Sequence, residues 1–393
     1  MSRYVSWFDS PLPCGLYYNQ AHEAWRSTIR SFVDEEILPH VEDWEEQGTF
    51  PRELYGKAAE IGFLRMGYPE ELGGIEMPDP FFGIVAHQEM ARHASGGLNA
   101  SLSSHNIGLP PVAAHAGQAL RERIVPEVLA GEKISALAIT EPSGGSDVAQ
   151  LRTRAAVDGD DYIVDGSKMF ITSGMRADYI TTAVRTSDAP GARGISLLLI
   201  EADAEGVSRT ELSKMGWWCS DTAAIYFDGV RVPRSHLIGP ENEGFSLIMR
   251  NFNSERLMMA AQSLGACRVC LDAAVSWAQQ RETFGRRLAE HQVIRHKIAQ
   301  MVQRIQATDA YLLQTAWRLH SEEAPPVVDL SLLKVQATEA MEFCAREAMQ
   351  ILGGAGYMRG HPVERIYREV RVSAIGGGSE EIMRDLAARQ LGL

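Results

Sequence analysis

The stretch that decides the fold is Ile134–Asp147, which reads Ile-Ser-Ala-Leu-Ala-Ile-Thr-Glu-Pro-Ser-Gly-Gly-Ser-Asp. Its first seven residues predict a strand, and the Pro-Ser-Gly-Gly that follows predicts a turn. Before it, from about Ala21 to Gly131, apolar residues recur at the three- and four-residue steps of helices. After it, short apolar runs separated by turns continue to Pro233, and the helical period returns beyond Gly244. The order is therefore helical, then β, then helical.

The β part is expected to be small and mostly antiparallel, because turns separate its short runs. Its expected strands are Ile134–Thr140, Thr153–Val157, Tyr162–Val164, Tyr179–Val184, Ile195–Ile200 and Ala224–Val232. The last part is expected to be an antiparallel bundle of long helices joined by short breaks. Its expected helices are Phe245–Arg281, Ala289–His320, Asp329–Leu352 and Ser379–Leu391. An alternating βαβ sheet and a single barrel do not fit this order.

Composition and net charge argue against several classes of function and location. The 393 residues carry 38 Lys and Arg against 51 Asp and Glu, a net charge of −13, which argues against a nucleic-acid partner. Five cysteines are an odd number in a long chain, so we expect a reducing, cytoplasmic location. The pair Cys267 and Cys270 has no zinc-spaced partners, and we expect no metal site. Neither a signal peptide nor a membrane span is expected.

A Rossmann dinucleotide site is not expected. No Gly-x-Gly-x-x-Gly stands between a strand and a helix, and the nearest candidate, beginning at Gly354-Ala355-Gly356, lacks the third glycine. Any dinucleotide must therefore be held by another arrangement.

Two segments, Thr140–Asp147 and Asp165–Thr172, together resemble the acyl-CoA dehydrogenase family of flavoproteins. Further motifs follow in the family's order: Met215-Gly216-Trp217, Ser220-Asp221-Thr222, Glu243-Gly244-Phe245, Arg281–Gly285, Glu290-His291-Gln292 and Gln350–Tyr357. The resemblance covers nearly the whole chain. It implies an α+β multi-domain fold with an N-terminal α-helical domain (1–131), a middle antiparallel β-barrel-like domain (132–240) and a C-terminal four-helix-bundle domain (241–393).

The resemblance implies FAD as the cofactor. Residues implied to contact the flavin from the strand and turn segments are Leu137, Ile139, Thr140, Gly145, Ser146, Phe170, Ile171 and Thr172. Those implied to serve the FAD of a neighbouring subunit are Arg281, Phe284, Gln292, Gln350, Gly353 and Gly354, and Ser379 and Glu381 are implied as flavin contacts near the C-terminus. Many family members have Trp where Phe170 stands, and Phe keeps the stacking surface but loses a donor. Sites shared between subunits imply a homo-oligomer, expected to be a tetramer.

The catalytic base is where this chain departs from many family members. They carry a Glu near the C-terminus in Tyr-Glu-Gly-Thr, and the corresponding position here is Gly377. Glu255 is the expected replacement, as in the isovaleryl- and long-chain branches of the family. It shares a helix face with Ile248, Phe252 and Met259, and no Lys or Arg stands three or four residues away. Desolvation of a carboxyl on such a face favours general-base chemistry.

Glu380 and Glu381 are rival bases because they follow Gly377 closely, but acids at a helix start commonly serve as caps. Gly377 itself is expected to donate its backbone N–H to the thioester oxygen. Ser146, Asn253, Arg256 and Gly378 are implied to bind the acyl-CoA.

The implied activity is α,β-desaturation of a medium-to-long or branched acyl-CoA, with electrons passing to an electron-transferring flavoprotein. Two alternatives stand beside it: an acyl-CoA oxidase or flavin monooxygenase on the same scaffold, and a non-catalytic binding protein. The segment Gly96–Ser101, rich in small residues, fits either a roomy pocket or close helix packing.

Overall fold

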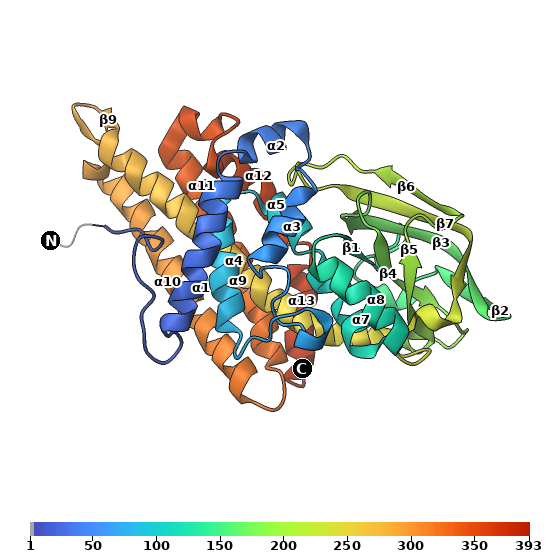
Figure 1. Cartoon of the computed structure of the whole chain (residues 1–393). Coiled ribbons are helices and arrows are strands. Elements are labelled where there is room, and N and C mark those ends of the chain that lie inside the picture. The colour runs from blue at the N-terminus through green and yellow to red at the C-terminus, as the bar shows by residue number, and fades with distance from the viewer. Residues whose placement is uncertain (1–3) are drawn as a thin grey trace. The chain divides into compact units, whose positions relative to one another are not determined.

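The computed structural model of the chain describes residues 4–393 (Figure 1). The chain divides into two compact units, one of Met1–Asp43, Pro78–Gly96 and Arg256–Leu393, and one of Trp44–Met77 and Gly97–Glu255. We call them the helical unit and the sheet unit. The long helix α9 (Gly244–Gln280) contributes its first part to the sheet unit and the rest, from Arg256, to the helical unit.

The sheet unit is built on an eight-stranded sheet in the order β6-β7-β3-β2-β4-β5-β8, with β1 pairing β4 from outside this path. Its strands are β1 (Ser135–Ala138), β2 (Arg154–Asp158), β3 (Asp161–Thr172), β4 (Tyr179–Arg185), β5 (Ile195–Glu201), β6 (Val207–Glu211), β7 (Thr222–Pro233) and β8 (Leu237–Ile238). The pairings are antiparallel except that β1 and the start of β2 pair with β4 in parallel. The prediction of a mostly antiparallel sheet is confirmed.

Helices α7 (Pro110–His115) and α8 (Gln118–Leu129) pack on strands β4 and β5 of this sheet. The unit also contains α3 (Glu53–Glu60), α5 (Gly96–Leu102) and α6 (His105–Gly108), and α2 (Val41–Gln47) crosses the unit boundary. Strands β4 and β5 are buried along nearly their whole length. Leu197 and Leu199 of β5 share a core with Val112 of α7 and Val125 of α8, so burial on this face explains the near-continuous apolar runs of these strands.

The helical unit is a bundle with one apolar core. Its helices besides α9 are α1 (Gln20–Phe32), α4 (Phe81–Met90), α10 (Gln292–Ser321), α11 (Val327–Leu352), α12 (Pro362–Ser373) and α13 (Glu380–Gln390). Leu264, Met301 and Leu333, from α9, α10 and α11, are fully buried in that core. Figure 1 shows α10 and α11 as the long helices of the orange part of the chain. The predicted long helices are confirmed to within a few residues.

The strand and helix predictions were wrong at several places. Strand β3 runs on to Thr172, well beyond the expected Val164, because it pairs along its length with β7. Strands β6 and β8 and helix α12 were not expected, and Gln292 rather than Ala289 begins α10. Two short strands, β9 (Glu282–Thr283) and β10 (Arg286–Arg287), form a hairpin where only a break was expected.

Buried charge holds α1 and α4 of the helical unit together. The Glu89 side chain is fully buried, and its carboxylate accepts from Arg26 Nε at 2.6 Å and Arg30 Nη2 at 2.9 Å. Arg26 and Arg268 lie on the Trp7 ring, 4.2 and 3.9 Å from its centroid. The segment before α1 is therefore bound to the bundle by two guanidinium groups.

Glu89→Gln is expected to lower the free energy of unfolding by about 3 kcal/mol, because it leaves two guanidinium groups facing a neutral amide. Urea unfolding followed by circular dichroism measures this. The matched control is Glu322→Gln, which removes an exposed pair with Arg318 and is expected to cost much less than the buried substitution, because solvent screens the pair. Equal losses in the two variants would contradict the assignment.

His105, in α6, makes the stability of the sheet unit depend on pH. Its Nε2 lies 2.9 Å from the Leu64 carbonyl oxygen, and burial lowers the pKa of the imidazole to about 4. Because this pKa lies below the ordinary 6.5, the unfolded chain takes up the proton first as pH falls. The stability contribution is complete above pH 6.5 and is lost as pH falls towards 4.

His105→Gln keeps a donor for the Leu64 carbonyl and removes the titration. The loss of unfolding free energy between pH 7 and pH 4.5 is expected to be smaller in this variant than in the unmodified chain by roughly 2 kcal/mol. Urea unfolding at both pH values measures the difference. An identical pH dependence in the two proteins would rule out His105 as its source.

Candidate functional site

The turn that follows β1 is tied to β3 by a buried ion pair. Lys168 Nζ lies 2.9 Å from Glu141 Oε1 and donates to the Ile139 carbonyl oxygen at 3.1 Å. The same carboxylate accepts from the Thr153 hydroxyl at 2.6 Å and from the Arg152 N–H at 2.6 Å. With its lone pairs taken up by these donors, Glu141 fixes the start of the Pro142–Ser146 turn.

Burial and the ion pair together determine the pKa values of Lys168 and Glu141. Burial lowers the pKa of Lys168 to about 8, and the Glu141 charge opposes that shift. Burial would raise the pKa of Glu141, but the Lys168 ammonium and the Thr153 hydrogen bonds outweigh it and hold that pKa below its ordinary value. The carboxylate therefore stays ionised at neutral pH and acts as an anchor.

Strand β3 bulges beside this turn. Its register against β7 shifts between Lys168 and Ile171, and the Met169 N–H donates to the Thr140 carbonyl oxygen at 2.8 Å. Phe170, inside the bulge, has φ +62° and a side chain that is 68 % exposed. A bulky residue rarely adopts this backbone conformation or leaves an aromatic ring in solvent, and both often mark a functional position. The bulge thus presents an aromatic face next to a turn of small residues.

The structure brings the predicted flavin contacts of the sheet unit into three adjoining segments. Leu137 lies in β1, Ile139, Thr140, Gly145 and Ser146 lie in or just before the turn, and Phe170, Ile171 and Thr172 lie at the end of β3. Ile139 and Ile171 are buried, whereas Gly145, Ser146 and Phe170 are exposed. The exposed members are free to meet a ligand.

Asn253 and Glu255 lie on α9 at the end of the sheet unit, and both are half-buried. Ile248, one turn and more before them, is buried in the core of that unit, and Phe252 packs against the same core. The apolar face expected around Glu255 is therefore present on its N-terminal side. Arg256, the next residue, is the first of the helical unit.

The C-terminal glycine turn links α12 to α13. Gly377 and Gly378 have φ +66° and +102°, a left-handed pair that side chains strain to adopt. Arg256 Nε donates to the Gly377 carbonyl oxygen at 3.4 Å, and Lys334 Nζ donates to the Gly378 carbonyl oxygen at 2.8 Å. Ser379 caps α13, accepting from the Ile382 N–H at 3.4 Å.

The rival bases have structural partners at the start of α13. Glu380 lies 3.4 Å from Arg384, one turn along the helix. Glu381 is exposed, and hydrogen bonds from its own backbone N–H and from the Ser379 hydroxyl lower the pKa of its carboxyl. A lowered pKa makes Glu381 a weaker base, and Glu380 is paired with Arg384, so both acids suit helix capping better than proton abstraction.

The hairpin of β9 and β10 turns through Phe284 and Gly285, with φ +52° and +74°. Two successive left-handed residues are the mark of a type I′ turn. The Phe284 side chain is 97 % exposed, and Arg281, directly before the hairpin, is exposed as well. The other residues predicted to serve a neighbouring subunit, Gln292, Gln350, Gly353 and Gly354, are exposed in the same helical unit.

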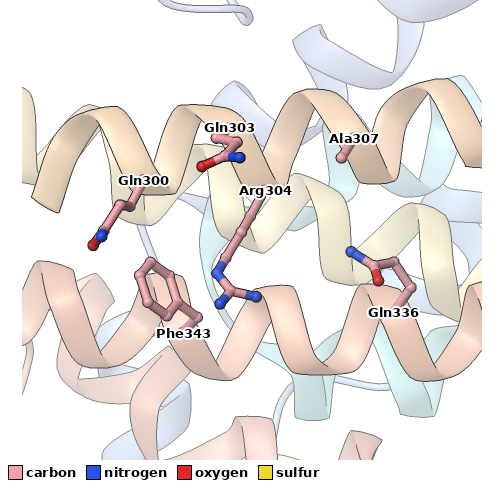
Figure 2. Close-up of a pocket in the computed structure, with 6 residues that line it drawn as sticks. All are labelled: Gln300, Gln303, Arg304, Ala307, Gln336 and Phe343. Atoms are coloured by element: carbon pink, nitrogen blue, oxygen red, sulfur yellow. The ribbon is translucent and has the colours of Figure 1, made fainter. Parts of the chain in front are cut away.

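A surface pocket of about 320 Å³ lies between α10 and α11, away from these residues (Figure 2). Figure 2 shows Gln300, Gln303, Arg304 and Ala307 along one helix, facing Gln336 and Phe343 on the other. The Arg304 guanidinium lies 4.2 Å from the centre of the Phe343 ring. The lining contains no acid, thiol or imidazole, so it does not supply a general base.

Of the two interpretations of the segment Gly96–Ser101, a roomy pocket or close packing, Gly97 supports close packing. A Cβ on Gly97 would lie 2.8 Å from Trp217 Cα, so glycine permits the close approach of these two backbones. Ser101 is buried and donates to Ser220 Oγ at 2.8 Å.

Sequence reasoning missed Lys168, Glu141 and Lys334 as buried anchors. A signal existed for Lys334, because it stands alone among Leu330, Leu333 and Thr338 on the buried side of its helix. Within residues 4–393, no group of three or more His, Cys, Asp or Glu side chains is arranged to hold a metal ion. In that same part of the chain, no helix combines the length and apolar character that a membrane crossing requires.

Comparisons with known proteins agree with this geometry. Three family models match, described as the N-terminal, middle and C-terminal domains of acyl-CoA dehydrogenase, over residues 19–132, 136–230 and 242–392. The mitochondrial long-chain specific acyl-CoA dehydrogenase of Rattus norvegicus is 36% identical over 95% of this chain and 87% of its own length. The mitochondrial isobutyryl-CoA dehydrogenase of Dictyostelium discoideum is 33% identical over 93% of this chain and 88% of its own.

A solved structure described as a putative acyl-CoA dehydrogenase from Mycobacterium smegmatis superposes with a TM-score of 0.93 at 43% identity, covering 96% of this chain and 99% of the other. Together these matches define an oxidoreductase with helical, β and helical parts. The chain belongs to the acyl-CoA dehydrogenase family, whose members are FAD-dependent and dehydrogenate acyl-CoA thioesters. The alternative of a non-catalytic binding protein is therefore not retained.

Proposed function

We propose that this acyl-CoA dehydrogenase desaturates its substrate between the α and β carbons, with Glu255 as the base. The Glu255 carboxylate takes the α-proton, the electrons of that C–H bond form the new double bond, and the β-hydrogen leaves as hydride. Bound FAD would supply the acceptor for that hydride, its flavin N5. The substrate becomes an enoyl-CoA, the proton remains on Glu255 and the hydride would go to the flavin, so protons and electrons balance.

One observation carries the base assignment. The turn that holds an acid in many relatives carries Gly377 here, and Arg256, which follows Glu255 in α9, donates to the carbonyl oxygen of that glycine. The partners of Glu380 and Glu381 at the start of α13 argue against the rivals. Glu255 then remains as the acid best suited to the role.

The flavin would be held by the turn and bulge of the sheet unit. Exposed Gly145 and Ser146 leave N–H groups and a hydroxyl accessible without bulky side chains, and exposed Phe170 offers an apolar ring face. These features fit a planar ring with a polar chain attached. Ser146, Asn253, Arg256 and Gly378 are proposed for the acyl-CoA, and Ser379 and Glu381 for further flavin contacts.

A homo-oligomer, with a tetramer as the proposed form, would complete the site. Support comes from the hairpin, where Phe284 is almost fully exposed on a left-handed backbone and Arg281 stands beside it. An Arg fork can bind a pyrophosphate in two-point fashion. With Phe284, Gln292, Gln350, Gly353 and Gly354, Arg281 is proposed to reach the FAD of a second copy.

The proposed substrate is a medium-to-long or branched acyl-CoA, and the proposed electron acceptor is an electron-transferring flavoprotein. The names of the two relatives, a long-chain and an isobutyryl enzyme, support long and branched chains respectively. A cytoplasmic location is proposed, in agreement with five free thiols among the described residues.

Glu255→Gln tests the proposed base. The variant is expected to keep bound FAD but to reduce it at least about a thousandfold more slowly, since a positioned base contributes 10²–10⁴-fold. Anaerobic stopped-flow absorbance of the flavin, after mixing with acyl-CoA, measures the rate of this half-reaction.

The matched control is Glu381→Gln, which removes the rival carboxylate but keeps an amide able to make the proposed flavin contact, and is expected to change the rate of flavin reduction less than about threefold. Unchanged flavin reduction in Glu255→Gln, or a collapse confined to Glu381→Gln, would move the base elsewhere.

Arg281→Ala tests the shared site. It is expected to weaken FAD binding about tenfold to a hundredfold, the loss of a charge-assisted pair of hydrogen bonds. Titration of apoprotein with FAD, followed by flavin fluorescence, measures the dissociation constant. Arg287→Ala, an exposed arginine of the same hairpin, is expected to leave affinity within about threefold, and equal losses would indicate a general charge effect.

A further inference from the structure

The inference concerns the glycine turn between α12 and α13, and it rests on the function proposed above. The turn contains three successive glycines, Gly376, Gly377 and Gly378, and such a tripeptide has more conformational freedom than any other. A backbone N–H stabilises a developing oxyanion only if it is held in place before the reaction. Something must therefore restrict this turn.

Two buried cations restrict it from one side. The Arg256 side chain is buried and its Nε donates to the Gly377 carbonyl oxygen at 3.4 Å. The Lys334 side chain, on α11, is 1 % exposed, and its Nζ donates to the Gly378 carbonyl oxygen at 2.8 Å. Both donors are charged, and charge-assisted hydrogen bonds are the stronger kind. Consecutive carbonyls of the turn are thus directed at cations in the bundle.

The peptide group that joins Gly376 to Gly377 is held by the peptides on both of its sides. The Gly376 N–H donates to the Val372 carbonyl oxygen at 2.8 Å, which fixes the peptide that joins Ile375 to Gly376. The peptide joining Gly376 to Gly377 therefore lies between fixed neighbours. Among residues 4–393, neither the Gly376 carbonyl nor the Gly377 N–H makes a hydrogen bond. Gly377 is partly exposed.

We propose that Lys334 and Arg256 are positioning residues that hold the glycine turn so that the Gly377 N–H is oriented to bind the thioester oxygen of the substrate. The Gly377 carbonyl shares its planar peptide with the Gly378 N–H, and the Gly378 carbonyl shares its peptide with the Ser379 N–H, so the two cations fix the peptides that follow Gly377. The Gly376 N–H bond fixes the peptide two places before, and the Gly377 N–H is held between these fixed peptides. The left-handed φ values of Gly377 and Gly378 complete the arrangement. Lys334 acts only through the turn, whereas Arg256, proposed above as an acyl-CoA contact, acts in this role through its bond to the Gly377 carbonyl.

The test uses the FAD-loaded enzyme and trans-2-hexadecenoyl-CoA labelled with carbon-13 at the carbonyl, an unsaturated product that cannot be dehydrogenated at that position again. Isotope-edited infrared difference spectroscopy measures how far binding lowers the thioester carbonyl frequency. Lys334→Met and Arg256→Met are each expected to lose at least half of the shift seen in the unmodified enzyme. Arg256→Lys, which keeps a cationic donor, is expected to retain most of it.

Kinetics separate positioning from binding. In both Met variants kcat is expected to fall about tenfold, less than the 10²–10³ of losing an oxyanion donor outright. In Lys334→Met, which has no proposed substrate contact, KM is expected to change less than about threefold. The matched control is Lys297→Met, which removes the Lys297–Glu347 ion pair from the same bundle without touching the turn. It is expected to keep the full shift and the full kcat.

A full carbonyl shift in folded Lys334→Met and Arg256→Met would overturn the proposal while leaving the Glu255 base intact. Should Lys334→Met fail to fold, as circular dichroism would show, Arg256→Met compared with Arg256→Lys still decides. If the unmodified enzyme binds the enoyl-CoA without any shift, the donor role of Gly377 and this inference both fall, whereas the Glu255→Gln rate tests the base independently.

Discussion

The ion pair of Lys168 with Glu141 is the constraint on which the sheet side of the site depends. A lysine and a glutamate removed from water cost several kcal/mol each unless their partners are well placed. Here the carboxylate accepts from an ammonium, a hydroxyl and backbone N–H groups, and the ammonium also meets a backbone carbonyl. Loss of either charge would loosen both the turn after β1 and the bulge of β3, because the pair joins them beside the Met169–Thr140 backbone hydrogen bond.

In the helical unit, too, buried cations hold backbone carbonyl groups. Lys334 and Arg256 direct charge at carbonyl groups of a glycine turn, as Lys168 does at Ile139. In each case a flexible stretch of backbone, which a ligand must approach closely, is held by a buried cation behind it. Small residues face the ligand and charged residues provide the rigidity that small residues lack.

The sequence predicts the regular elements of this fold better than its anchors. Strands β4 and β5 and helix α11 follow from apolar runs and from periodicity, since burial of those side chains is what forms them. Strand β6 is polar and mostly exposed, and β7 alone defines it, so no local pattern predicts it. Helix α12 buries Arg365 and Glu369, which reverses the usual polar-outside pattern. The anchors join residues distant in sequence, 27 positions apart for Lys168 and Glu141 and 44 for Lys334 and Gly378, and periodicity carries no information about such pairs. The location of the base on α9 remains a prediction, as do the domain boundaries.

The hairpin that carries Phe284 has a consequence for how the protein is made. Its two strands pair residues only a few positions apart in sequence, so they can pair in microseconds, long before a bundle of helices from both ends of the chain can assemble. A nascent chain therefore displays a bare aromatic ring from its earliest stage. Crowded synthesis exposes such chains to premature association through that ring, so slow expression at low temperature favours recovery of the native protein.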